Sequence, residues 1–196
     1  MPQIYTTVVA SNHWISLTEG SGILPEVIEE RGYYTATNID ELTALGFESY
    51  QKSVPALVIP VWGAEGELRF HRTRPDNPRR SKKPSKVVKY EQPENKPPTL
   101  DVPRRCQPYL SDTSRRLWIV EGEKKADSLA SRGEVVIGLL GVWGWKKDGY
   151  PLPDWDGVYL IGREVYICFD SDAAKKTEVR RARTNLAKYL DARGAK

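Results

Sequence analysis

The stretch VYICFDSDAAKK, Val165–Lys176, joins a short apolar run to a pair of aspartates and then to a basic segment. The apolar residues are typical of a buried β-strand. Asp170 and Asp172 come at its end, and residues two apart on an extended chain point to the same side. Like charges placed so close together repel each other unless a cation lies between them. The pair also has a simpler interpretation, because Asp172 suits the N-cap of a helix that begins near Ala173.

A second apolar run, LWIVEG at residues 117–122, also ends in an acid, Glu121. Residues 123–133 then have helical spacing, residues 134–141 are typical of another strand, and residues 173–194 are typical of an amphipathic helix. The order strand, helix, strand, connection, strand, helix predicts a mainly parallel sheet with right-handed crossovers. We therefore predict an α/β fold in which helices flank this sheet.

The predicted sheet brings the acidic residues together. Ligands of an open parallel sheet bind at the carboxyl ends of its strands, which is where Glu121, Asp170 and Asp172 lie. If the two strands are neighbours, three carboxylates share one place. Mg²⁺ binds a few carboxylate oxygens and keeps waters for substrate phosphates. We therefore predict that these three residues bind Mg²⁺ or Mn²⁺ and are catalytic.

The chain divides into two parts by composition. We predict a small basic α+β region over residues 1–114 and the α/β domain over residues 115–196. Within the first part, the patterns indicate short helices in residues 24–46, a β-hairpin at residues 56–72, and a basic, proline-rich connection at residues 73–114.

The two short helices have recognisable ends. Pro25 lies near the start of the first helix and Gly32 follows its end, the usual placement of these residues. Asn38 is the predicted N-cap of the second, and Glu41 follows at the spacing of a capping box.

Positive charge gathers in residues 69–90, RFHRTRPDNPRRSKKPSKVVKY, which hold nine lysines and arginines and one acid, Asp76. The net charge of the whole chain is +4, so the remainder is acidic overall. Such a run is often only a solvated loop. The alternative is a polyanionic partner, because clustered cations displace counterions from a phosphate backbone. Phe70, His71 and Tyr90 interleave the charges, which suits a single strand whose bases are free to stack.

Composition limits the class of protein. The chain has 196 residues and two cysteines, Cys106 and Cys168. Two thiols exclude a four-cysteine zinc module and fit a reducing compartment. No apolar run approaches the roughly 20 residues that a membrane span needs, and the N-terminal residues lack the features of a secretory signal. We therefore predict a cytoplasmic protein that does not enter a membrane.

Aromatic residues gather in residues 141–155, GVWGWKKDGYPLPDW, among several turn residues. We interpret Trp143, Trp145 and Trp155 as anchors that hold this segment to the core. Stacking on a base at the edge of the sheet is the alternative.

Together these segments resemble the TOPRIM domain, which bacterial DnaG-type primases share with type IA and type II topoisomerases and some nucleases. Its first motif, a hydrophobic strand that ends in Glu-Gly, is matched by Glu121 and Gly122. Its second motif, a strand that ends in Asp-x-Asp, is matched by Asp170 and Asp172. Gly141 in LLGVWGW occupies the place of the glycine turn that follows the middle strand in primases.

The resemblance extends upstream and covers residues 55–196. The segments LVIPVWGAEGELRFHRTR, KVVKYEQPE and LWIVEG follow in the order of DnaG-type primases. The resemblance is strongest to primase-like proteins of phages, plasmids and other mobile elements, in which such a domain often precedes a helicase.

The resemblance implies metal-dependent synthesis of RNA primers on single-stranded DNA. Nucleoside triphosphates would be the substrates and a replicative helicase a partner. By position, Arg72, Arg74 and Lys89 would contact the template or the incoming nucleotide. Neighbouring cations complete the predicted nucleic-acid or nucleotide-binding set: Arg79, Arg80, Lys82, Lys83 and Lys124.

The sequence departs from the family pattern in three respects. It lacks the zinc ribbon with which many primases recognise their template. EGEKKAD replaces the primase-typical Glu-Gly-Tyr-x-Asp, which leaves the role of Asp127 open. A TOPRIM sheet usually continues beyond the last helix, whereas this sequence stops at LDARGAK, so either the sheet is shortened or the sequence is a piece of a longer protein. Two other functions stay open: a TOPRIM nuclease with Glu121 as general acid or base, and a non-catalytic module that binds nucleic acid or a partner protein.

Overall fold

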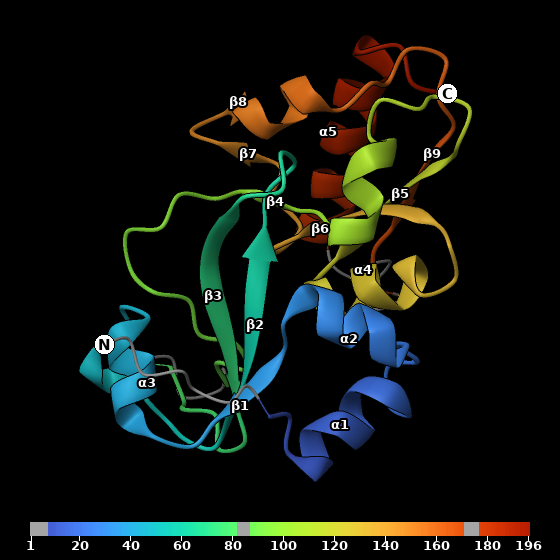
Figure 1. The fold of residues 1–196 in the computed structure, drawn as a ribbon. Coiled ribbons are helices and arrows are strands. Elements are labelled where there is room, and N and C mark those ends of the chain that lie inside the picture. The colour runs from blue at the N-terminus through green and yellow to red at the C-terminus, as the bar shows by residue number, and fades with distance from the viewer. Residues whose placement is uncertain (1–7, 82–86, 171–176) are drawn as a thin grey trace.

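The structure is a computed structural model that describes residues 8–81, 87–170 and 177–196. Its N-terminal half contains helices around a three-stranded antiparallel sheet, which we call the N-terminal sheet (Figure 1). Its elements are α1 (Ser11–Thr18), α2 (Pro25–Arg31), β1 (Tyr34–Ala36), α3 (Ile39–Ala44), the 3-10 turn η1 (Ser49–Gln51), β2 (Ala56–Trp62) and β3 (Leu68–Pro75). β2 pairs with both β1 and β3, and the β2–β3 hairpin lies where the sequence predicts one.

Local chemistry explains where the short helices begin and end. The side chain of Asn38 accepts a hydrogen bond from the backbone of Asp40, and the side chain of Glu41 accepts one from the backbone of Asn38. This is the capping box that the sequence indicates. Gly32 ends α2 with a φ of +83°, a left-handed conformation that glycine adopts without strain.

The second half contains a four-stranded sheet, which we call the parallel sheet. Its strands lie in the order β4-β6-β5-β9, and β5 runs parallel to both β6 and β9. β4 joins the edge antiparallel to β6. The mainly parallel α/β sheet predicted from the sequence is confirmed. The elements are β4 (Leu100–Asp101), η2 (Arg104–Tyr109), β5 (Leu117–Glu121), α4 (Glu123–Ala130), β6 (Val135–Leu139), β7 (Lys146–Lys147), β8 (Tyr150–Pro151), η3 (Pro153–Gly157), β9 (Val165–Cys168) and α5 (Thr177–Ala192).

The parallel sheet draws on residues from both sides of the boundary that we predict at residue 114. β4 belongs to the proline-rich connection 73–114, which has no strand periodicity in its sequence. Leu100 pairs with Leu139 and Asp101 with Gly138 of β6, so this segment covers one edge of the sheet.

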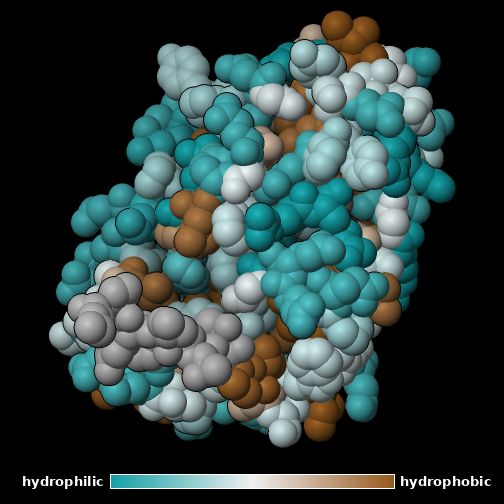
Figure 2. Space-filling view, viewed as in Figure 1, coloured by the Kyte–Doolittle hydropathy of each residue, from teal (hydrophilic) through white to brown (hydrophobic). Residues whose placement is uncertain are grey.

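The largest hydrophobic core lies around the parallel sheet and includes buried residues of α4 and α5. Trp155 is fully buried and Trp145 is 4% exposed, so two of the three tryptophans in residues 141–155 anchor that segment. A smaller core joins α1 and α2 to β2. On the face shown in Figure 2, hydrophilic residues predominate and hydrophobic ones form separate patches. In the part of the chain that the structure describes, none of the helices is long and apolar enough to cross a membrane.

A buried ion cluster connects α2 with α4 and β4. The guanidinium of Arg31 donates to Asp101 at 2.5 Å and, through two nitrogens, to Asp127 at 2.6 and 2.8 Å. The hydroxyl of Tyr33 also donates to Asp127, at 2.6 Å. All four residues are buried, and we call them the Arg31 cluster. Asp127, whose role the sequence leaves open, is therefore a structural partner of Arg31.

The Arg31 cluster makes stability depend on pH. Burial raises the pKa of Asp101 from its usual 3.8 to about 6, against the opposing effect of Arg31. The folded state therefore holds this proton more tightly than the unfolded chain. The resulting stability is fully present below pH 3.8 and is lost as the pH rises through about 6. Relative to an Asp101→Asn variant, the wild type should lose about 2 to 3 kcal/mol of unfolding free energy across this window.

Urea unfolding of the wild type and of Asp101→Asn, at about pH 4 and about pH 7, measures this difference. The comparison removes the contribution of other carboxylates, which titrate in both proteins. An unchanged difference between the two proteins would show that Asp101 has an ordinary pKa in the folded state.

Candidate functional site

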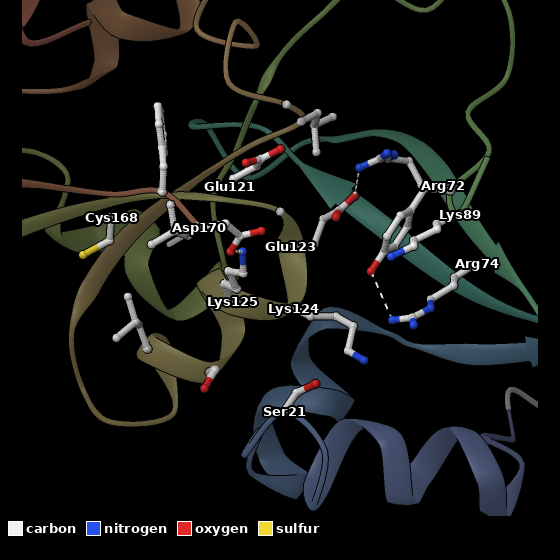
Figure 3. A pocket seen from close by; sticks show the side chains of 18 of the residues that line it. Ser21, Arg72, Arg74, Lys89, Glu121, Glu123, Lys124, Lys125, Cys168 and Asp170 are labelled. Atoms are coloured by element: carbon white, nitrogen blue, oxygen red, sulfur yellow. Dashed lines mark hydrogen bonds and ion pairs between the residues drawn. The ribbon is translucent and has the colours of Figure 1, made fainter. Parts of the chain in front are cut away.

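A pocket of about 960 Å³ opens where the two halves of the molecule meet (Figure 3). Its walls come from the carboxyl ends of β5 and β9, the first turns of α4, β3, and the segment around Tyr90. The pocket therefore lies at the edge of the parallel sheet where the sequence predicts a ligand site.

Two predicted metal ligands lie in the acidic wall of this pocket. β5 and β9 are neighbouring parallel strands, paired from Leu117–Val165 to Val120–Cys168. Glu121 at the end of β5 and Asp170 just beyond β9 both line the pocket. The third predicted ligand, Asp172, lies outside the described residues.

Gly122 makes the turn that brings Glu121 to this position. The chain passes from β5 into α4 at Gly122 with a φ of +95°, which strains any residue that has a side chain. The backbone N–H of Gly122 donates to the carbonyl of Leu139 on β6 at 2.9 Å. The Glu-Gly pair seen in the sequence thus combines a carboxylate with the glycine that the turn requires.

Asp170 has a cationic partner in the first turns of α4. The ammonium of Lys125 forms an ion pair with the Asp170 carboxylate, and both side chains are about half exposed. The acidic wall therefore attracts a cation at this position. Within residues 8–81, 87–170 and 177–196 no group of three or more His, Cys, Asp or Glu side chains is arranged to hold a metal ion.

The opposite wall of the pocket is basic and comes from β3 and the segment that follows it (Figure 3). Arg72 and Arg74 alternate along β3, so their side chains share one face of the N-terminal sheet. Their guanidinium carbons lie 5.0 and 5.5 Å from the ring centre of Tyr90, within the range of cation–π attraction. Lys89, which precedes Tyr90, is exposed and lines the same pocket. Three of the residues predicted to bind nucleic acid or a nucleotide are thus brought together.

Lys124 lies beneath the basic wall and is also part of the pocket. Its ammonium donates to the hydroxyl of Ser16 on α1 at 3.1 Å. Burial, with a smaller effect of the positive charge on Arg74, lowers the pKa of Lys124. An anion in the pocket would relieve this mutual repulsion.

The remaining predicted cations do not line the pocket. Arg79 forms a two-pronged ion pair with the buried Glu91, at 2.6 and 3.1 Å, and lies over the ring of Tyr50. Arg80 is exposed and pairs through its backbone with Val87. Lys82 and Lys83 lie outside the described residues.

Sequence reasoning missed Glu123 as a residue of the pocket. Glu123 is 1% exposed, and its carboxylate accepts a hydrogen bond from Arg72 at 2.6 Å. It lies in the first turn of a charged helix, where solvent exposure is the usual expectation, and the signal available is its position directly after the Glu121–Gly122 turn. Lys125 also lines the pocket. Its position in the sequence favours a solvated lysine, with a phosphate contact beside the metal as the alternative.

The sequence matches a family of undetermined role over part of its length. A family model described as Domain of unknown function (DUF3854) matches residues 107–196. This range contains the parallel strands β5, β6 and β9 and the acidic wall of the pocket. The comparison with curated proteins gave no match.

The comparison with solved structures decides the fold. One solved structure contains the zinc-binding and RNA polymerase domains of the Aquifex aeolicus primase. It is 17% identical to this chain and superposes with a TM-score of 0.63, over 95% of this chain and 48% of that one. The chain has a primase-like fold. A structure of the DnaG catalytic core is 16% identical, with a TM-score of 0.59 over 92% of this chain and 60% of that one. A DNA primase domain from Pseudomonas aeruginosa is 16% identical, with a TM-score of 0.55 over 87% and 57% of the two chains.

The primase-like fold extends over both halves of the molecule. This chain spans 48% to 60% of the length of these three solved chains. At such low identity the likeness concerns the fold alone.

Proposed function

We propose that this chain is a TOPRIM-type primase core, which joins nucleoside triphosphates into primers on single-stranded DNA. The observation that carries the proposal is the arrangement of the pocket. Glu121 and Asp170 form one wall, and the cations of β3 and its neighbouring segment form the other. The negative charge of a triphosphate is complementary to the basic wall. The divalent metal ions that a triphosphate binds are complementary to the acidic wall.

The acidic wall has the chemistry that a divalent metal site needs. Carboxylate oxygens are the ligands that Mg²⁺ and Mn²⁺ prefer, and Asp170 already attracts the ammonium of Lys125. Glu121, Asp170 and, from outside the described residues, Asp172 would hold the ion. When bound, it would neutralise and orient the triphosphate.

The side chains of the basic wall would hold the phosphates in place. Arg74 can present a fork of donors to a phosphate, Arg72 adds a guanidinium that Glu123 already holds by one nitrogen, and Lys89 adds a mobile point charge. Tyr90 lines the pocket beside both arginines and is suited to stack on a base. In this arrangement the 3′-hydroxyl of the growing strand loses its proton to water, its oxygen bonds to the α-phosphorus, and the bond from that phosphorus to the departing pyrophosphate breaks. Positioning the two reactants supplies a large part of such a rate enhancement.

The proposal includes the partners and the setting that the sequence resemblance implies. Single-stranded DNA would run along the basic segment, and a replicative helicase would act with the primase in phage or mobile-element replication. A solved neighbour described as the DnaG primase catalytic domain bound to single-stranded DNA, 17% identical with a TM-score of 0.51, supports the choice of template. We also propose the division into residues 1–114 and 115–196, with the pocket between the two parts.

Primer synthesis tests the function. Wild-type protein, single-stranded DNA, labelled nucleotides and Mg²⁺ or Mn²⁺ should give a labelled product that chelation abolishes. Asp170→Ala removes one carboxylate of the acidic wall and should lower the rate about 100-fold or more. Binding of the DNA should persist in this variant, because the cations that hold the strand are unchanged.

Asp191→Ala is the matched control, since Asp191 is an exposed aspartate on α5 and lies outside the pocket. It should keep the wild-type rate. Equal activity in Asp170→Ala would contradict the assignment of the site. Shortening of the template without added nucleotides would instead favour the nuclease, and binding without any turnover would favour the non-catalytic module.

A further inference from the structure

Glu123 is an acid in the middle of a cation-rich pocket. It is the first residue of α4 and lies between the acidic and the basic wall in Figure 3. Its side chain is 2% exposed, and its carboxylate forms an ion pair with Arg72 at 2.6 Å. A buried carboxylate beside a proposed anion site weakens anion binding by simple Coulomb repulsion. The Glu123 carboxylate therefore does not help to bind the anion directly, and its role has to come from its contact with Arg72.

Arg72 is held on two sides. One terminal nitrogen of its guanidinium donates to Glu123, and the ring of Tyr90 lies 5.0 Å from its central carbon. The side chain is 16% exposed, so most of its length is packed. Its Nε is buried and has no hydrogen-bond partner in the part of the chain that the structure describes. Glu123 thus fixes one donor of an arginine that is mostly packed and still lines the pocket.

The ion pair also bridges the two halves of the molecule. Arg72 belongs to β3 of the N-terminal sheet, and Glu123 follows Glu121 and Gly122 at the start of α4. The pair therefore connects the basic wall directly to the turn that carries the Glu121 carboxylate. Without it, the guanidinium of this long and flexible side chain would be held only by the ring of Tyr90, which belongs to the basic wall itself.

We infer that Glu123 is a positioning residue, which holds the Arg72 guanidinium in the orientation that receives a phosphate of the substrate strand. This inference rests on the proposed function for the identity of the phosphate. Replacing Glu123 frees the Arg72 guanidinium, which weakens the binding of DNA, and removes a negative charge, which strengthens it. The inference predicts that the first effect is the larger one. Because the two effects have opposite signs, a measurement of DNA binding separates them.

The experiment measures binding of a short fluorescein-labelled oligodeoxythymidylate by fluorescence anisotropy, in chelator and without nucleotides. Glu123→Ala removes the ion pair and should weaken binding about five- to tenfold. Glu123→Gln keeps a weaker hydrogen bond and should fall between this variant and the wild type. Glu29→Ala, at an exposed glutamate of α2, is the matched control and should bind at least as well as the wild type.

A double-mutant cycle shows whether Glu123 acts through Arg72. In an Arg72→Ala background, Glu123→Ala should cause no further weakening, because there is no guanidinium left to orient. Arg72→Ala itself should reduce the magnitude of the slope of log K against log salt by about 0.7, as one phosphate contact to a single strand requires. If Glu123→Ala does not fold, the same comparison is made with Glu123→Gln, measured with and without Arg72→Ala.

The outcomes distinguish this inference from the proposed function. Binding that becomes tighter or stays equal in Glu123→Ala and Glu123→Gln would overturn the inference alone. Equal weakening by Glu123→Ala with and without Arg72 would also overturn it, since Glu123 would then act elsewhere. A wild-type protein that binds no oligonucleotide would overturn both. Weaker binding that depends on Arg72, in a wild type that synthesises no primer, would support the inference and contradict the catalytic proposal.

Discussion

Replacing Arg31 with methionine should lower the free energy of unfolding by about 3 to 5 kcal/mol. Arg31 is 2% exposed and is paired with Asp101 and Asp127, whose side chains are fully buried. Methionine has a similar length but leaves both carboxylates without their cation. Removing one partner of a buried pair is costly because the remaining charge stays buried and unpaired. Equilibrium unfolding in urea at neutral pH measures the loss.

Two further variants show where this energy comes from. Arg181→Met, at an exposed arginine of α5, should change the unfolding free energy by less than about 0.5 kcal/mol. Adding Asp101→Asn and Asp127→Asn to Arg31→Met removes the unpaired charges and should recover part of the loss. A loss in Arg31→Met below about 1 kcal/mol would mean that the cluster is dispensable for stability.

Replacing Trp155 with alanine should also lower the free energy of unfolding by about 3 to 5 kcal/mol. Trp155 is fully buried, and its indole nitrogen donates to the carbonyl of Trp145 at 2.9 Å. Its ring meets Tyr189 of α5 edge to face at 5.5 Å, and Trp145 stacks on the same tyrosine at 5.3 Å. The alanine variant would leave a cavity between α5 and the segment that leads to β9. Urea unfolding followed by near-ultraviolet circular dichroism reports on this packing.

Trp14→Ala is the control for this variant. Trp14 is 38% exposed on α1, so its truncation should cost much less than that of Trp155. Trp155→Phe keeps most of the apolar volume and loses the hydrogen bond, and it should lie between the two. Similar losses at Trp14 and Trp155 would contradict the anchoring role of the buried indole.

The features that the sequence predicts well depend on short-range patterns. The capping box at Asn38 needs residues that are three apart, and the turn at Gly32 needs one glycine after a helix. The parallel arrangement of β5 and β9 follows from alternating strands and helices, which leave few topologies open. The placement of Glu121 beside Asp170 then follows from the rule that parallel strands end at the same edge.

The features that sequence reasoning missed depend on pairs that are distant in the chain. Arg31 and Asp127 are separated by 96 positions, and Arg72 and Glu123 by 51. Each of these residues alone has the appearance of an ordinary helix or strand charge. β4 was missed for a related reason: two residues among prolines have no periodicity, and only pairing with β6 makes them a strand. Such partners are chosen by tertiary packing, which a local pattern does not encode.

The two cysteines differ so much in exposure that a reagent can label one of them without the other. Cys106 is 2% exposed, and burial raises the pKa of its thiol to about 11. Cys168 is exposed and lines the pocket close to Asp170. A thiol-reactive dye or spin label applied to the native protein will therefore attach at a single position in the pocket wall. The wild-type chain thus contains a natural reporter of pocket occupancy, and ligand binding can be followed spectroscopically without introducing any new residue.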